Sequence, residues 1–375
     1  MQHVTFKKTN SDFFDEIKEK TNDYFALNKF NKTGNYKLYI KSVVFILSLI
    51  ISYMTLLFFT LPMGVAAIFY IILGVTLAGI GFNIMHDGAH GSYSRKKWLN
   101  ELMAYSLNLM GGNAFIWKNK HNVNHHTYTN IEGMDDDIDI EPWMRTHFSK
   151  PKFWFHRYQH IYGLPLYGLT HFNWVFVSDL KKYFLRKIAQ TTLNKMSFKE
   201  HFIFWLSKII CVSIFLIIPI IMIGFLKAII GFAIMSFTCG FILGTVFQLA
   251  HVIEDAEFPM PLEGSNKMEQ TWVLHQIATT VNFATKSKLL SWFTGGLNFQ
   301  IVHHIFPKIS HVHYPEINKL IRETCKKFSV KYTEYPTLLH AVRSHISYLK
   351  ILGSVEDPAY QHQANKTQTH AAFNQ

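Results

Sequence analysis

Several histidines stand at spacings that suit a shared metal site. His86 and His90 are four residues apart, and His121, His125 and His126 follow one another at intervals of four and one. Residues four apart lie on the same face of an α-helix, so each cluster would present its imidazoles to one side. Imidazole nitrogen is a common ligand of transition metals in proteins. The two clusters therefore predict metal ligands.

The second half of the chain adds further candidates. His303 and His304 are adjacent and follow Gln300, while His251 stands near the end of a long apolar run. A histidine in that position needs a polar partner or a metal. With the first two clusters, these residues form the predicted ligand set: His86, His90, His121, His125, His126, His251, Gln300, His303 and His304.

The type and number of these ligands indicate two iron ions. So many histidines exceed the four ligands that one tetrahedral zinc ion takes, and the three cysteines show no Cys-x-x-Cys spacing. Two ions of near-octahedral coordination would use them all, and imidazole suits iron that binds dioxygen at open positions. Soluble di-iron proteins use Glu and Glu-x-x-His ligands, a pairing that is not visible here. We therefore expect an all-histidine di-iron site with dioxygen as co-substrate.

Four apolar runs must position these ligands. Residues 42–60, 64–85, 209–226 and 228–253 are long enough to cross a bilayer, and residues 61–63 and Lys227 form short turns between them. The composition agrees, because 49% of the residues are hydrophobic and only 17% are charged. The sequence predicts an all-α integral membrane protein with four transmembrane helices in two hairpins.

Basic residues indicate the orientation of these helices. Lys and Arg concentrate in residues 1–41, 85–204 and 252–375, whereas the hairpin tips hold only Lys227. Cytoplasmic loops retain such residues, so both termini and the metal site are expected on the cytoplasmic side. The net charge of +12 is spread over segments that flank the apolar runs. Anionic membrane lipids, and not nucleic acid, are therefore the expected partner.

The remaining segments complete the predicted architecture. Residues 1–35 are expected to form a cytosolic arm with some helix, residues 36–355 one membrane domain, and residues 356–375 a disordered tail. Residues 99–117 predict an amphipathic interfacial helix or, alternatively, a fifth and partial span. Interfacial helices and a cytoplasmic helical cap would then hold the histidines.

The three histidine clusters, in this order and with hairpins between them, resemble the membrane-bound fatty acid desaturase family. The run Trp292-Phe293-Thr294-Gly295-Gly296-Leu297-Asn298-Phe299-Gln300-Ile301-Val302-His303-His304-Ile305-Phe306-Pro307 is most similar to front-end, or linoleoyl-CoA-like, desaturases. The resemblance covers residues 36–350 and implies that two iron ions and dioxygen introduce a double bond into a fatty acyl substrate, carried as acyl-CoA or phospholipid. It also implies a further ligand after the second hairpin, at His251.

Two departures from the family pattern matter. Val302 stands where front-end enzymes usually have Glu, and no His-Pro-Gly-Gly haem motif occurs. The first leaves the position of the double bond open. The second implies that the fused cytochrome b5 domain is missing, so a separate electron donor of ferredoxin or cytochrome b5 type and its reductase are expected.

Two other interpretations remain open. A related hydroxylase, ketolase or alkane monooxygenase would use the same metal chemistry but insert oxygen, and residue types alone do not separate these outcomes. A metal transporter would need ionisable residues along its spans, whereas these apolar runs are nearly free of charge.

Other side chains are candidates for supporting roles. His275 is expected as a ligand or as a neighbour of the ligands, and Asp87 and Asp135 could orient ligand imidazoles through their free N–H groups. His311 and His313 are expected to form hydrogen bonds or to contact lipid headgroups. The other histidines considered are expected to be ordinary interfacial residues: His147, His156, His160, His171 and His201.

Overall fold

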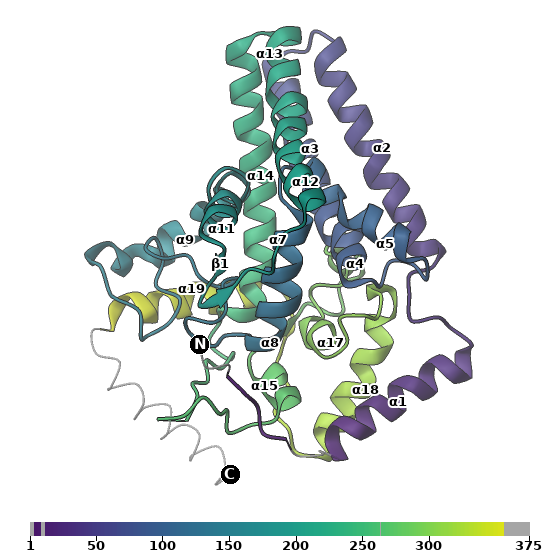
Figure 1. Cartoon of the computed structure of the whole chain (residues 1–375), viewed down its shortest axis with the longest axis vertical. Helices are drawn as coiled ribbons and strands as arrows, with labels where there is room; N and C mark the ends of the chain where they lie inside the picture. The colour runs from purple at the N-terminus through teal and green to yellow at the C-terminus, as the bar shows by residue number, and fades with distance from the viewer. Residues whose placement is uncertain (1–3, 9–11, 263, 356–375) are drawn as a thin grey trace.

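The computed structural model describes residues 4–8, 12–262 and 264–355 of the chain. Its helices form a narrow shaft above a broad base (Figure 1). Within the described residues, four helices are long and apolar enough to cross a membrane: Tyr36–Phe58, Met63–His90, Phe198–Ile223 and Phe225–His251. The predicted mostly helical fold with four such helices is confirmed. The predicted disordered tail, residues 356–375, lies outside the described residues.

Two of the four spans are interrupted by a π-helical turn. Such a turn widens the helix locally and is frequent at functional sites. In the second span it stands directly before His86, which begins the last helical turn. The spans are built from α2 (Tyr36–Phe58), then α3 (Met63–Ile80), η1 (Gly81–Met85) and α4 (His86–His90), then α12 (Phe198–Val212), η5 (Ser213–Ile217) and α13 (Ile218–Ile223), and finally α14 (Phe225–His251).

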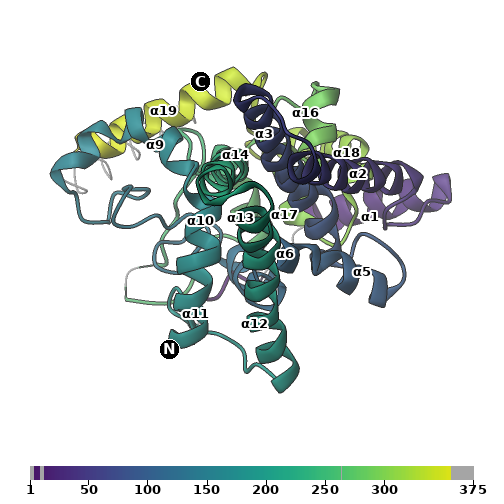
Figure 2. The same cartoon turned by 90° about the horizontal axis from the view of Figure 1, so that it is seen from above.

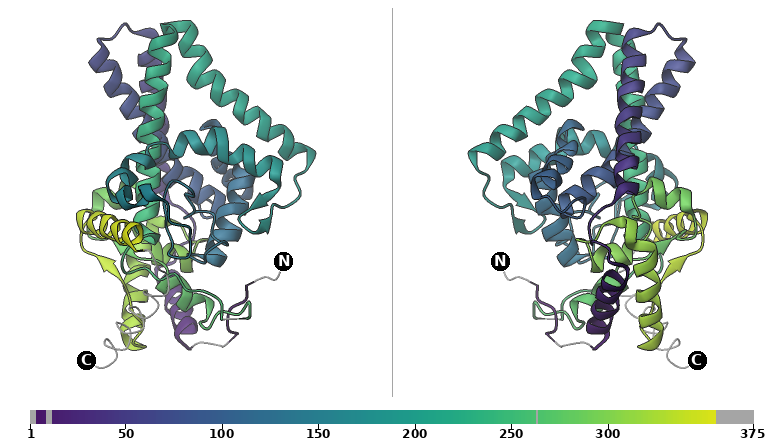
Figure 3. Two further views of the ribbon diagram at one scale, coloured as in Figure 1. Left: turned by 90° about the vertical axis from the view of Figure 1, so that its left-hand side faces the viewer. Right: turned by 90° about the vertical axis from the view of Figure 1, so that its right-hand side faces the viewer.

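Small residues let α3 and α14 pack closely at the centre of the shaft. A Cβ atom on Gly74 would lie only 2.6 Å from the carbonyl oxygen of Met235, so no larger residue fits there without moving α14. α2 packs along the other side of α3, as the view from above shows (Figure 2). The third span leans away from α14 toward the base (Figure 3).

The outer surface of the shaft is apolar. On α2, Val43, Leu47 and Ile51 are each about half exposed. Helical backbone satisfies its own hydrogen bonds, so an apolar helix can face hydrocarbon without loss. Gly224, with a φ of +92°, reverses the chain between α13 and α14, and residues 59–62 connect α2 to α3. The shaft therefore has the surface expected of membrane-embedded helices.

Three short helices replace the single amphipathic helix predicted for residues 99–117. The chain turns at Gly111, whose φ of +90° does not continue a helix. The side chain of Asn113 then accepts the backbone N–H of Ile116 and starts a new helix. The three helices are α5 (Lys97–Ala104), α6 (Ser106–Leu109) and α7 (Ala114–Lys118).

The rest of the segment between the second and third spans folds around the top of the base. It consists of short helices and one two-stranded antiparallel ribbon, in which Lys187 pairs with Thr192. The elements are η2 (Asn119–His125), α8 (His126–Tyr128), η3 (Trp154–Tyr158), α9 (Gln159–Tyr167), α10 (Thr170–Asn173), η4 (Trp174–Ser178), α11 (Asp179–Leu185), β1 (Lys187–Ile188) and β2 (Thr191–Thr192).

The base combines helices from both ends of the chain. The predicted N-terminal helix is present, and its buried Phe13 and Ile17 pack with residues of α18 in one hydrophobic cluster. A short parallel strand pair joins Asn282 to Glu334. The elements are α1 (Asp12–Asn28), α15 (Trp272–Ala278), β3 (Asn282–Phe283), α16 (Lys288–Phe293), α17 (Gln300–Ile305), η6 (His311–His313), α18 (Tyr314–Lys327), β4 (Glu334–Tyr335) and α19 (Leu338–Ser354).

Candidate metal centre

Eight histidines converge where the shaft meets the base. The Nε2 atom of each is buried and, among the residues that the structure describes, has no hydrogen-bond partner. They are the eight histidines of the predicted ligand set: His86, His90, His121, His125, His126, His251, His303 and His304. Four separate segments of the chain supply them, namely α4, η2 with α8, the end of α14, and α17. The sequence clusters are therefore brought together in space.

The possible ligand atoms fall into sets whose members lie within 4.8 Å of one another. The first histidine group consists of His86, His90, His121 and His303. The second histidine group consists of His125, His251 and His304. His126 forms a further set with His303 and His304, so it lies between the two groups. This grouping is compatible with metal binding.

Local structure turns these imidazoles toward each other. The π-helical turn η2 carries His121 and His125, whose rings are stacked with centroids 5.1 Å apart. α4 ends at Gly91, whose φ of +74° suits a residue without a side chain and caps the helix directly after His90. Two aromatic rings complete the enclosure. The Trp117 ring stacks on the His121 ring with centroids 4.4 Å apart, and the centroid of the Phe247 ring lies 5.2 Å from that of the His125 ring.

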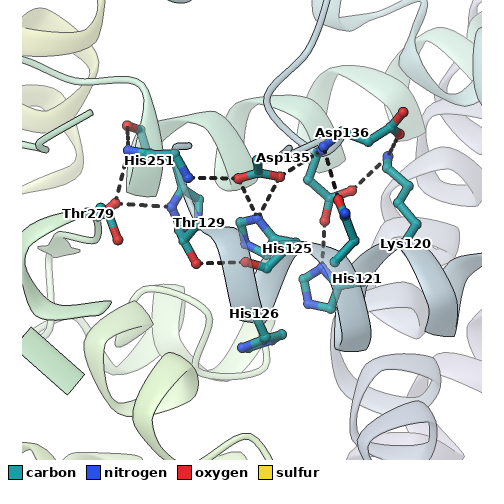
Figure 4. A network of polar contacts seen from close by, with 12 residues as sticks. Lys120, His121, His125, His126, Thr129, Asp135, Asp136, His251 and Thr279 are labelled. Atoms are coloured by element: carbon teal, nitrogen blue, oxygen red, sulfur yellow. Dashed lines mark hydrogen bonds and ion pairs between the residues drawn. The ribbon is translucent and has the colours of Figure 1, made fainter. Parts of the chain in front are cut away.

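Two carboxylates orient the imidazoles of η2. His121 Nδ1 donates to Asp137 Oδ2 over 2.7 Å, and His125 Nδ1 donates to Asp135 over 2.9 Å. Lys120 binds the other oxygen of Asp137 over 2.7 Å. Figure 4 shows His125 with Asp135, and His121 and Lys120 beside them. A proton fixed on Nδ1 leaves the lone pair of Nε2 free for a metal. Asp135 thus contacts one of the predicted ligands, and its role in orienting that ligand stays a prediction.

Neutral partners orient the imidazoles of α17. His304 Nδ1 donates to Gln276 Oε1 over 2.8 Å, and the same oxygen accepts the hydroxyl of Thr129. His303 Nδ1 lies 3.2 Å from the hydroxyl of Tyr314. Sequence reasoning missed these three partners. Gln276 directly follows the candidate His275 in the sequence, whereas no sequence feature near Thr129 or Tyr314 indicates a role.

Burial and charge set the protonation of these groups. Burial lowers the pKa of His126, His303 and His304 well below the ordinary value for histidine, and neighbouring imidazoles lower it further. Burial also lowers the pKa of His121. At His125, burial opposes the charged form, but Asp135 outweighs it and raises the pKa. Most of the cluster is therefore neutral near pH 7, which is the form that binds metal.

The other predicted site residues lie close by with different contacts. Gln300 is buried in the first turn of α17, and its Oε1 has no hydrogen-bond partner among the described residues. His275 belongs to none of the ligand sets found in the described part of the chain, and its Nε2 donates to the carbonyl oxygen of Thr129 over 2.9 Å. The Asp87 carboxylate contacts Ser310 and His311. His275 therefore supports the segment after His126.

Two histidines expected at the interface are in fact buried. His156 Nε2 donates to the carbonyl oxygen of Pro142 over 2.8 Å, and His171 Nδ1 lies 2.9 Å from the hydroxyl of Ser236. The first contact joins residues 14 positions apart and the second joins residues 65 positions apart, and the spacing of residues within one helix reveals neither. His147 is also buried, whereas His160 is half-buried.

The donor set fits metal ions on chemical grounds. A buried polar atom without a partner costs about 1–3 kcal/mol, and here the Nε2 atoms of eight histidines share that condition in one place. A metal ion that accepts their lone pairs would remove this cost. The histidine clusters are therefore compatible with metal binding.

Comparison with known proteins identifies the family. A sequence profile described as "Fatty acid desaturase" matches residues 31–336. The chain is 35% identical to the sn-1 linoleoyl-lipid 6-desaturase of Arthrospira platensis, over 92% of this chain and 94% of that protein. It is 34% identical to an acyl-lipid (8-3)-desaturase of Physcomitrium patens, over 92% of this chain and 73% of that protein. With its four apolar helices and its histidine clusters, the chain thus belongs to the fatty acid desaturase family and is an oxidoreductase.

Proposed function

We propose that this protein introduces a double bond into a fatty acyl chain of a membrane lipid, using two iron ions and dioxygen. The observation that carries the proposal is the set of eight buried histidine Nε2 atoms, grouped within ligand distance of one another and free of cysteine. Imidazole suits iron that must bind dioxygen. A lipid-linked substrate is favoured over acyl-CoA because the relatives reported above are named for acyl-lipid and linoleoyl-lipid substrates.

The two histidine groups would hold one ion each. The first group offers four imidazoles and the second offers three. His126 adds one more imidazole, which lies near members of both groups. Gln300 remains a proposed additional ligand, because its buried Oε1 has no partner within the described residues. When bound, iron would supply the activation of dioxygen that breaking an unactivated C–H bond requires.

The surrounding protein residues perform the other tasks. Asp137, Asp135 and Gln276 keep a proton on the Nδ1 atom of His121, His125 and His304, so that each Nε2 can bind. Trp117 and Phe247 cover the imidazoles and exclude water, which protects a reactive site from side reactions.

The position of the centre supports a membrane topology. The elements α4, α8 and α17, which carry histidines of the cluster, lie at the base end of the spans, on the same side as α1 and α19 (Figure 1). We infer that the spans cross the bilayer in two hairpins. We also infer that the metal centre and both ends of residues 36–355 face the cytoplasm, because loops rich in Lys and Arg are retained on that side. A separate electron carrier and its reductase would deliver electrons from that side.

Desaturation is favoured over insertion of oxygen. The relatives reported above are named desaturases, so the hydroxylase, ketolase or alkane monooxygenase alternative finds no support in them. Metal transport is also not favoured, because the histidines cluster at the ends of the spans and not along them.

Expression in a host without polyunsaturated lipids tests the function. Mass spectrometry of total fatty acids should show a new double bond, absent with a His303→Ala variant expressed to the same level. A hydroxylated product would contradict desaturation, as would an unchanged profile from metal-loaded protein supplied with a reductase and carrier. Turnover by purified protein with NAD(P)H and dioxygen alone would contradict the need for a separate carrier.

A further inference from the structure

A cation is buried inside the first span. Lys41 belongs to α2, and its side chain is only 5% exposed. A charged amine inside a membrane helix is costly unless it is paired. The Lys41 ammonium donates to Asn83 Oδ1 over 2.8 Å and lies 3.0 Å from His311 Nε2. Its nitrogen also stands 5.5 Å from the centre of the Trp292 ring.

The contacts continue to a buried carboxylate. His311 Nδ1 lies 3.1 Å from Asp87 Oδ2, and the Ser310 hydroxyl donates to the same oxygen over 2.6 Å. An imidazole that accepts from the Lys41 ammonium at Nε2 carries its proton on Nδ1, the atom that faces Asp87. The imidazole of His311 therefore stands between a buried positive and a buried negative charge. We call these three residues the Lys41–His311–Asp87 chain.

The Lys41–His311–Asp87 chain lies next to residues of the first histidine group. Asp87 adjoins His86 in α4, and His311 follows α17, which carries His303. The first histidine group needs these two segments to stay together, because it combines residues of α4 and α17. The second group takes His125 and His251 from other elements and shares only α17.

We propose that the Lys41–His311–Asp87 chain holds α4 against the segment after α17, and that Lys41 is thereby a positioning residue for the metal site of the first histidine group. The inference rests on the proposed metal centre. It assigns to a residue of the first span a role at a site to which that span contributes no ligand. Loss of Lys41 would leave the Asp87 carboxylate buried without its compensating charge, and α4 would separate from Ser310 and His311.

Metal titration of purified variants tests this assignment. Ferrous iron is added without oxygen to metal-free wild type, Lys41→Met, Asp87→Asn and the double variant, and bound iron is measured after gel filtration. We expect wild type to bind two ions and each single variant to bind one of them about 10- to 100-fold more weakly. The double variant should recover much of the lost affinity, because it removes both charges together.

Lys208→Met is the matched control. Lys208 is also a lysine inside a span, and its Nζ donates to the carbonyl oxygen of Val175 over 2.8 Å and lies 3.3 Å from Asp179 Oδ2. Its variant should unfold at a lower temperature yet bind two ions normally. If Lys41→Met does not fold, Ser310→Ala tests whether the first histidine group depends on the contact between α4 and the segment after α17, because it removes one hydrogen bond to Asp87 and no charge.

The possible outcomes separate the two claims. Wild-type affinity at both sites in Lys41→Met, equal loss at both sites, the same loss in Lys208→Met, or a double variant no better than the single ones would overturn the positioning role. Should wild type itself bind no metal, the proposed function would fail, and this inference with it.

Discussion

The shaft and the base of the molecule are held together in different ways. In the shaft, α3 and α14 pack through small and apolar residues such as Gly74 and Cys239. Where the shaft meets the base, many polar side chains are buried, and the Nε2 atoms of eight clustered histidines lack a partner among the described residues. The contacts of the shaft are those of a packed membrane helix bundle, whereas bound metal would satisfy the polar atoms of the histidine cluster.

This difference predicts which property a substitution in each region should change. Substitutions that disturb packing in the shaft should lower stability and spare metal binding. Substitutions around the histidines should lower metal affinity and spare the fold. Three histidines link the regions, because His86 and His90 stand at the base end of the second span and His251 stands at the base end of the fourth.

The largest effect is expected at His251. Its Nε2 belongs to the second histidine group, and the residue ends α14. His251→Ala should abolish product and lower bound iron while expression and membrane insertion stay intact, as measured by fatty acid analysis and elemental analysis. His147→Ala is the control, because His147 is largely buried but belongs to none of the ligand sets in the described residues. Normal iron and turnover in His251→Ala would mean that the centre forms without it.

A smaller effect is expected at the carboxylates that follow η2. Asp135→Asn should weaken metal binding by about 10- to 100-fold, because Asp135 orients His125. Asp136→Asn is the neighbouring control, since Asp136 contacts Lys182 over 3.0 Å instead. Its loss should change metal affinity by less than about fivefold. Equal effects of the two changes, in titrations with ferrous iron, would contradict the assigned roles.

The shaft should respond in stability alone. Gly74→Val would force α3 away from α14 and should cost about 1–3 kcal/mol in the free energy of unfolding. Gly64→Val serves as the control, because a Cβ atom on Gly64 meets no described atom within 4 Å. Unfolding in detergent gives the difference. Metal stoichiometry should remain that of wild type in both variants, and a loss of metal in folded Gly74→Val would break the distinction between shaft and base.

Sequence reasoning succeeded where the signal is local. Long uncharged runs reveal membrane helices, and histidines at spacings of four and five reveal clusters, so four spans and the eight converging histidines were predictable. The third span begins at Phe198, well before the predicted start at residue 209. The predicted run started after Lys208 because a charged residue interrupts the apolar sequence there. In the structure Lys208 is paired with Asp179, so the span includes it.

Partners far apart in sequence escaped prediction. Tyr314, Gln276 and Thr129 contact the histidines of α17 only because the chain folds back on itself. Lys41 belongs to the basic segment 1–41 that the sequence predicted to be cytoplasmic. Its contact with His311 joins two residues that lie far apart in the sequence. Spacing within one segment carries no information about such contacts. The residue roles at the metal centre, including that of Gln300, therefore remain predictions.

Elemental analysis of purified protein tests the central claim most directly. Protein from iron-replete cells should carry about two iron ions per chain, and their removal by a chelator should abolish desaturation until iron is restored. Zinc ranks above iron in intrinsic affinity, so activity must be measured after iron is restored. One zinc ion and no iron per chain, with full activity that added iron does not change, would contradict the account.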